Sequence, residues 1–147
     1  DPQASVCEFV VKGVKSLQRK ALNQGWAVYE SERVYLRGYC MSPGVSFRNG
    51  LLGGVFVHAL FRPHKGDMDD VVQWPFKLRV KLRFVHPNGG EEIECVDCPS
   101  IFRLSYQRPR EGQEQSIFTS FNFSLDDLVH DGYVEDDQLR VKFELLP

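Results

Sequence analysis

Histidines are the side chains best suited to acid–base chemistry near neutral pH, and the four in this chain are scattered. His58 lies in an apolar run, where a core or interface histidine with a satisfied hydrogen bond is the expected role. His64 and His86 stand beside prolines in segments typical of turns. No nucleophile motif, zinc-protease motif or glycine-rich phosphate loop accompanies them. The sequence therefore predicts no catalytic residues, no enzyme activity and a function in binding.

Thiols offer redox or zinc chemistry, and the spacing fits neither. Cys95 and Cys98 form the one close pair, but a zinc site needs a second pair, and Cys7 and Cys40 lie far apart. A redox pair opens a helix, whereas two acidic residues and a proline surround this one. We expect four reduced thiols, as in a cytosolic protein.

Carboxylates gather at two places, Asp67, Asp69 and Asp70 and again residues 135–137. The first cluster offers oxygen ligands for a hard cation, but neither cluster has the spacing of a calcium loop. We expect them to be solvated loops and caps of turns. The sequence thus predicts no metal site and no cofactor.

Length and charge limit the class of partner. The chain has 147 residues, which suits one domain over residues 1–147. Its formal net charge is −2, whereas nucleic acids and anionic membranes attract a basic excess. No apolar run approaches the roughly 18 residues that span a bilayer. We therefore expect protein partners, no nucleic acid and no direct membrane insertion.

The clearest element is a strand at residues 77–84, in which apolar and basic side chains alternate. A turn at residues 87–90 leads to a partner strand at 92–96. If those four residues form the loop, Phe84 faces Ile93 and Arg83 faces Glu94 on opposite faces of the hairpin. The basic stripe is then a solvated face beside an acidic strand.

Similar runs predict strands at residues 33–40, 55–61, 101–106, 116–123 and 138–145. Alternation in the first of these places Arg37 and Tyr39 on one face. A glycine-bounded loop is expected between Gly44 and Gly54. One helical turn is expected after Ser124, which can cap it. Seven or eight short antiparallel strands indicate an all-β, two-sheet sandwich.

The N-terminal segment is read as a strand from Glu8 to Lys12 followed by a polar loop. Val10, Val14 and later apolar residues have heptad-like spacing, which is typical of a coiled coil. Gly13 interrupts this pattern, and only about two heptads are present. We therefore favour the strand and loop.

Three segments together resemble a known family. They read KGDMDDVVQWPF at residues 65–76, SYQRP at 105–109 and GYVEDD at 132–137. Their order and spacing are similar to the C-terminal MATH domain of the TNF-receptor-associated factors (TRAF). The resemblance covers roughly residues 33–145, and the first 30 residues match only loosely.

The resemblance implies an eight-stranded antiparallel β-sandwich in a cytoplasmic signalling adaptor. Such a domain binds short extended peptides of receptor tails or adaptors, which add to an edge strand. The family also implies a homotrimer built by an upstream coiled coil, with RING and zinc-finger modules further upstream. None of these modules is in the sequence, and any ubiquitin-ligase activity would belong to them.

The family's peptide-facing Arg-x-Tyr matches Arg37 and Tyr39, while Pro43 stands where the family often has an acidic residue. The edge strand would be residues 116–120, where Ile117 favours an apolar or aromatic ligand residue and Arg37 a carboxylate. The expected peptide-binding residues are Arg37, Tyr39, Phe56, Ser105, Tyr106, Ser116, Ile117, Phe118 and Thr119.

Two other functions stay open. One is a substrate-recruiting MATH domain of a ubiquitin-ligase adaptor or deubiquitinase. The other is an extracellular MATH module of a secreted protease, which the glycosylation sequon at Asn122 would suit. The Trp-Pro-Phe and Gln-Arg-Pro motifs favour the signalling adaptor over these two alternatives.

Overall fold

Two antiparallel sheets face each other across a single hydrophobic core in the computed structural model, which describes residues 3–97 and 107–147. The first sheet runs in the order β1 (Val6–Lys12), β10 (Gln138–Leu146), β6 (Arg79–Val85) and β7 (Ile93–Asp97). A two-residue strand, β9 (Val134–Glu135), pairs with β10.

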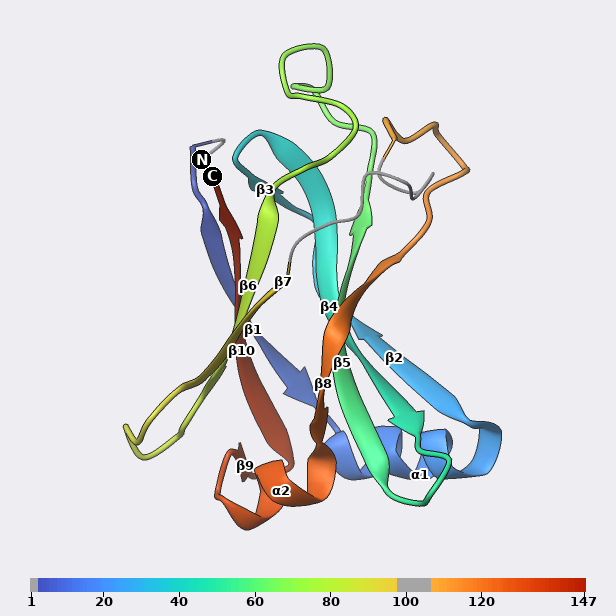
Figure 1. The fold of residues 1–147 in the computed structure, drawn as a ribbon, viewed down its shortest axis with the longest axis vertical. Helices are drawn as coiled ribbons and strands as arrows, with labels where there is room; N and C mark the ends of the chain where they lie inside the picture. Colours follow the sequence, from blue (N-terminus) through green and yellow to red (C-terminus); the bar gives the residue numbers. More distant parts are fainter. Residues whose placement is uncertain (1–2, 98–106) are drawn as a thin grey trace.

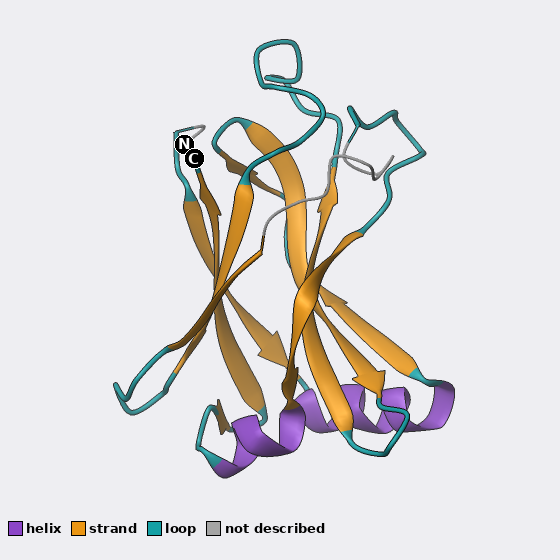
Figure 2. Ribbon diagram, viewed as in Figure 1, coloured by secondary structure: helices purple, strands orange, loops and turns teal. Residues whose placement is uncertain are grey.

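The second sheet runs in the order β2 (Trp26–Glu30), β4 (Tyr39–Asn49), β5 (Val55–Pro63) and β8 (Ile117–Ser124). A short strand, β3 (Val34–Leu36), pairs with β4. Within the described residues the two main paths therefore contain eight strands, and the predicted antiparallel β-sandwich is confirmed (Figure 2). The predicted strand at 101–106 lies outside the described residues.

The β6–β7 hairpin has the predicted register, because Phe84 pairs with Ile93 and Arg83 with Glu94. The inward side chains of β6 are buried in the core. The basic side chains face acidic neighbours, with 3.3 Å between Lys81 Nζ and Glu94 Oε2. Arg83 is likewise 3.0 Å from Glu144 on β10. Two of the four basic residues of the stripe, Lys81 and Arg83, therefore form cross-strand ion pairs.

Helix α1 (Val14–Gln24) replaces the polar loop expected after β1, so that expectation was wrong. Gly13, in a left-handed conformation, precedes the helix and does not interrupt it. Val14 and Ala21 are buried against the end of the sandwich, where α1 lies beneath the second sheet in Figure 1. The apolar spacing therefore reflects packing on the sheets and not a coiled coil.

A distant residue caps this helix. The backbone N–H groups of Gly13 and Val14 both donate to the carbonyl oxygen of Asp137. The N–H of Lys15 donates to Asp137 Oδ1 at 2.8 Å. The acidic cluster at 135–137 thus caps an element, although one that is far away in sequence.

The second helix, α2 (Leu125–His130), is where the sequence predicts it. Ser124 Oγ accepts the N–H of Asp127 at 3.3 Å, as expected for an N-cap. Neither helix in the described ranges is long and apolar enough to cross a bilayer.

Residues 33–40 do not form one strand, and the placement of Arg37 and Tyr39 on a single face was wrong. β3 ends at Leu36, and Arg37 and Gly38 both have positive φ, 48° and 84°. This is a two-residue hairpin turn, whose twist suits the flanking strands. β4 then continues to Asn49, through the residues expected to begin a loop.

We expect Asp137→Ala to lower the free energy of unfolding by about 1 kcal/mol, because it removes the carboxylate that caps α1. Alanine also tolerates the positive φ of this position poorly. Asp137→Asn keeps an acceptor and suits that backbone, so it should cost less. Chemical denaturation of both variants measures the difference, and equal stability of Asp137→Ala and the parent protein would contradict the cap.

Candidate functional site

Alternation along β4 and β5 directs one set of side chains into the core and the other onto the outer face of the second sheet. The strand registers place these outward-facing side chains next to one another across neighbouring strands. Arg48 on β4 is opposite Trp26 and Phe56. The eight residues that we call the Arg48 face are Trp26, Val28, Ser46, Arg48, Phe56, His58, Phe118 and Asn122.

Arg48 lies at the centre of this face. Its guanidinium carbon is 4.6 Å from the centre of the Phe118 ring, a cation–π arrangement. Arg48 Nε also donates to Ser46 Oγ at 3.3 Å, which aligns the side chain along the sheet. No carboxylate in the described part of the chain forms an ion pair with it. The guanidinium is therefore positioned and can still bind an anion.

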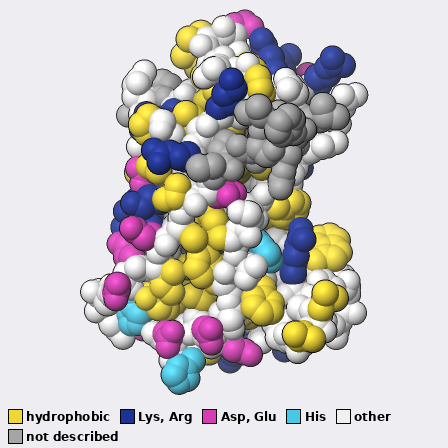
Figure 3. Space-filling model, viewed as in Figure 1, with side chains coloured by type: hydrophobic (Ala, Val, Ile, Leu, Met, Phe, Trp, Pro, Cys, Tyr) yellow, Lys and Arg dark blue, Asp and Glu magenta, His cyan; other side chains and the backbone are white. Residues whose placement is uncertain are grey.

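Two shallow hollows flank Arg48. The first, of about 460 Å³, lies between Trp26, Val28 and Phe118. The second, of about 430 Å³, lies between Phe56, His58 and Asn122. Figure 3 shows hydrophobic side chains exposed on the lower part of the molecule, with basic and histidine side chains among them. Each hollow offers apolar contact beside a fixed positive charge.

His58 contributes an uncharged ring to the second hollow. Burial lowers the pKa of His58 below its ordinary value, and the positive charge of Arg48 lowers it further. Both effects disfavour the imidazolium form. At neutral pH Arg48 is therefore the one charged side chain among the eight residues of the Arg48 face.

Among the described strands, β8 is the last of the second sheet, where the sequence predicts the edge strand, and this end of the sheet is modified. Phe118 pairs with Leu60 and Asn122 with His58, so three residues of β8 bulge opposite one of β5. Asp97 on β7 accepts the backbone N–H of Ser120 at 3.2 Å and its hydroxyl at 2.7 Å. A bulge and a side-chain cap both blunt a free edge.

The comparisons with known proteins agree on the fold. A TRAF5 structure from Notothenia coriiceps superposes with a TM-score of 0.79 at 20% sequence identity, over 96% of this chain and 72% of that one. The family model for the TRAF/meprin MATH domain matches residues 30–142. The chain belongs to the TRAF/meprin MATH domain family. A search of curated proteins finds no match.

MATH domains are generally protein-interaction modules, so the family supports the function in binding expected above. In this MATH domain the residues matched to the family's Arg-x-Tyr lie away from the Arg48 face. Tyr39 is only 5% exposed, and its ring contacts Trp74 and Phe76 edge-on, with centroids 5.2 and 4.9 Å apart. Its hydroxyl donates to the carbonyl oxygen of Gln73.

Arg37 lies in the β3–β4 turn and contacts the end of the first sheet. Its Nε donates to the carbonyl oxygen of Leu145 at 2.8 Å, and its backbone N–H donates to Ala4. The guanidinium therefore ties the turn to β10. Arg37 and Tyr39 are not brought together with Phe118.

The other predicted residues divide by orientation. Phe56 and Phe118 lie on the Arg48 face. Ile117 and Thr119 are buried, and Thr119 Oγ1 donates to the carbonyl oxygen of Ala59 at 2.9 Å. Ser116 is partly buried and directly precedes β8. Ser105 and Tyr106 lie outside the described residues.

The sequence analysis did not predict that five residues of the Arg48 face lie together on the surface. These are Trp26, Val28, Ser46, Arg48 and Asn122. The alternation of Ser42, Gly44, Ser46 and Arg48 with apolar residues was the available signal. Pro43 and Gly44 made this segment resemble a loop.

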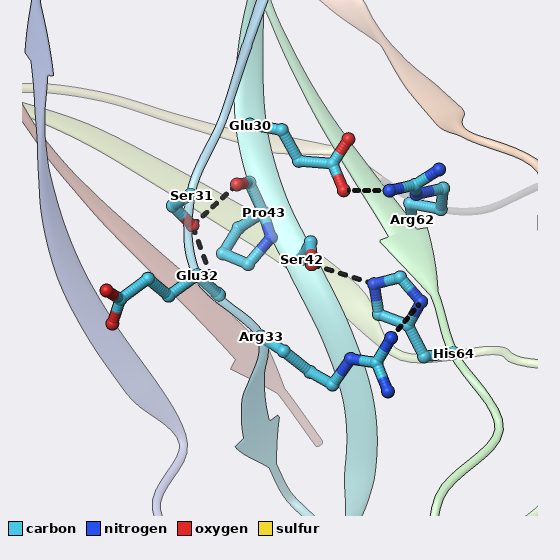
Figure 4. A network of polar contacts seen from close by, with 8 residues as sticks. All are labelled: Glu30, Ser31, Glu32, Arg33, Ser42, Pro43, Arg62 and His64. Atoms are coloured by element: carbon cyan, nitrogen blue, oxygen red, sulfur yellow. Dashed lines mark hydrogen bonds and ion pairs between the residues drawn. The ribbon is translucent and has the colours of Figure 1, made fainter.

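A buried Ser42–His64 pair is the arrangement in the described residues most similar to a catalytic site (Figure 4). Arg33 Nη2 donates to His64 Nδ1 at 3.4 Å, so the other ring nitrogen, Nε2, donates to Ser42 Oγ at 2.7 Å. A nucleophilic serine needs the reverse, with a base that accepts its proton and an acid that orients the base. The pair therefore stabilises the fold.

Burial lowers the pKa of His64, and the charges of Arg33 and Arg62 lower it further. The unfolded chain then binds a proton at a higher pH than the folded protein, so stability falls as the pH falls through this range. We expect the free energy of unfolding to decrease between about pH 7 and about pH 5, around the ordinary histidine pKa. His64→Gln keeps a donor and an acceptor and should reduce this pH dependence. An unchanged slope in denaturation curves of the variant would contradict the assignment.

Proposed function

We propose that this MATH domain is the peptide-binding domain of a cytoplasmic signalling adaptor, which recruits receptor tails or other adaptors. The observation that carries the proposal is the guanidinium of Arg48, held over Phe118 between two apolar hollows. The cores of protein interfaces are depleted of charged residues but enriched in aromatic side chains and arginine. A single arginine packed on a phenylalanine ring is therefore typical of a residue that contributes strongly to binding.

The ligand that suits this face is an extended peptide with a carboxylate flanked by apolar side chains. A carboxylate can bind the fork of Arg48 through two hydrogen bonds. Apolar residues on either side of it would fill the hollows beside Trp26 and Phe56. Main-chain groups of Ser116, just before β8, and of Ile117, its first residue, would pair with the peptide backbone, since the bulge and Asp97 modify the strand further along.

The expected site changes accordingly. Phe56 and Phe118 supply side-chain contacts. Ile117 and Thr119 belong to the strand that receives the peptide, and Ser116 directly precedes it. Arg48 takes the role first given to Arg37. In the full-length protein a homotrimer would raise the modest affinity of each site through avidity.

A peptide array screened with the parent domain, followed by titration of the best binder, tests this proposal. We expect Arg48→Glu to weaken binding at least about tenfold, because it replaces a charge-assisted hydrogen bond with repulsion. Phe118→Asp should have a similar effect. The matched control is Lys77→Glu, an equal charge change at an exposed residue before β6. Equal losses for Arg48→Glu and Lys77→Glu would contradict a site at Arg48.

The affinity for an acidic peptide should rise as the pH is lowered below neutral. The free domain holds the pKa of His58 low, whereas a bound carboxylate favours the imidazolium and raises that pKa. The complex then binds more protons than the free domain, so lower pH favours the complex. Titrations at several pH values measure this, and His58→Gln should remove the dependence. Affinity that stays constant or decreases as the pH is lowered would contradict it.

A further inference from the structure

The hairpin between β4 and β5 presents two leucines to solvent. Leu51 and Leu52 are 105% and 103% exposed, so neither packs on the domain. The turn that holds them is closed by backbone hydrogen bonds, from Gly50 N–H to Gly54 O at 2.8 Å and from Gly53 N–H to Gly50 O at 3.2 Å. The leucines are therefore displayed on a hydrogen-bonded tip, and nothing in the core accounts for their apolar character.

Further apolar side chains lie at the same corner. The N–H of Asn49, at the base of the hairpin, donates to the carbonyl oxygen of Gly25 between α1 and β2. On either side of Gly25, Leu22 is 49% exposed and Trp26 is 55% exposed. Figure 1 shows α1 and the β4–β5 turn at the same end of the molecule.

The charged side chains of α1 itself are all basic. Residues 9–29 contain no Asp or Glu, although the whole chain has a net charge of −2. Lys15, Arg19 and Lys20 are exposed on α1, and none forms an ion pair with a described residue. The overall charge that argued against membrane contact thus conceals a helix whose own charged side chains are all basic, although the Asp137 carboxylate lies at its N-terminal end. We call these three cations together with Leu22, Trp26, Leu51 and Leu52 the leucine corner.

We propose that the leucine corner binds the surface of an anionic membrane. Leu51 and Leu52 insert between lipid headgroups, where burial of their side chains is favourable. Trp26 lies at the level of the interface, which its amphipathic ring prefers. Lys15, Arg19 and Lys20 contact the acidic headgroups. The contact is peripheral and involves no spanning segment.

Shape favours a lipid surface over a protein partner. Protein interfaces have well-packed, complementary cores, whereas two leucines on a narrow glycine-flanked tip project beyond the surface. A fluid headgroup layer accommodates such a tip without a matching pocket. Asp126 and Asp127 on α2 lie at the other side of the same end, so the domain would tilt to bring α1 and the hairpin to the membrane (Figure 1).

This inference does not rest on peptide binding, and its test uses no peptide. The chain is sedimented with vesicles of phosphatidylcholine alone or with added phosphatidylserine. We expect binding to the second kind only, and weaker binding at high salt. Leu51→Ser with Leu52→Ser should reduce partitioning at least about tenfold. Replacing Lys15, Arg19 and Lys20 with Gln should reduce it about fivefold per charge.

The matched control is Val71→Ser, which changes a residue that is 74% exposed between β5 and β6 and should bind vesicles as the parent does. Failure of the parent to bind phosphatidylserine vesicles would overturn the proposal. Unchanged binding by the double leucine variant would overturn it as well. Self-association that the leucine variant abolishes, without vesicle binding, would instead assign the corner to a second copy of the chain.

Discussion

The packing of Tyr39 against Trp74 and Phe76 fixes the register on which the second sheet depends. Because Tyr39 points inward at the first position of β4, alternate residues as far as Arg48 point outward. The turn before it is equally constrained, since a Cβ on Gly38 would lie 2.8 Å from Val72 Cγ1. A slip of one residue would bury Arg48 and expose Phe47.

Residues of the first segment that carries the family resemblance are therefore structural. The segment from Lys65 to Phe76 closes over the β3–β4 turn, and Asp69 accepts the N–H of Gly66 within it at 2.9 Å. Trp74 Nε1 donates to the carbonyl oxygen of Asp69 at 2.9 Å. These contacts hold the segment against the β3–β4 turn and the start of β4.

Local patterns in the sequence predicted the elements whose stabilising contacts are local. The β6–β7 register and the Ser124 cap follow from residues close together in the chain. Helix α1 was missed because its capping carboxylate, Asp137, is 122 residues away. The turn at Arg37 was missed because an arginine at φ 48° gives no composition signal. That error also affected the candidate site, because the side chain of Arg37 contacts β10 and does not lie on the outer face with Arg48.

The most direct measurement of where ligands bind is an amide chemical-shift titration of the domain with the best peptide from the array. The largest shifts should occur at residues 46–48, 56–58 and 117–118, which surround Arg48 on three adjacent strands. Residues 37–39 should shift little, because Tyr39 is buried and Arg37 contacts β10. If the largest shifts occur at residues 37–39 or on the first sheet, the binding site is not the Arg48 face.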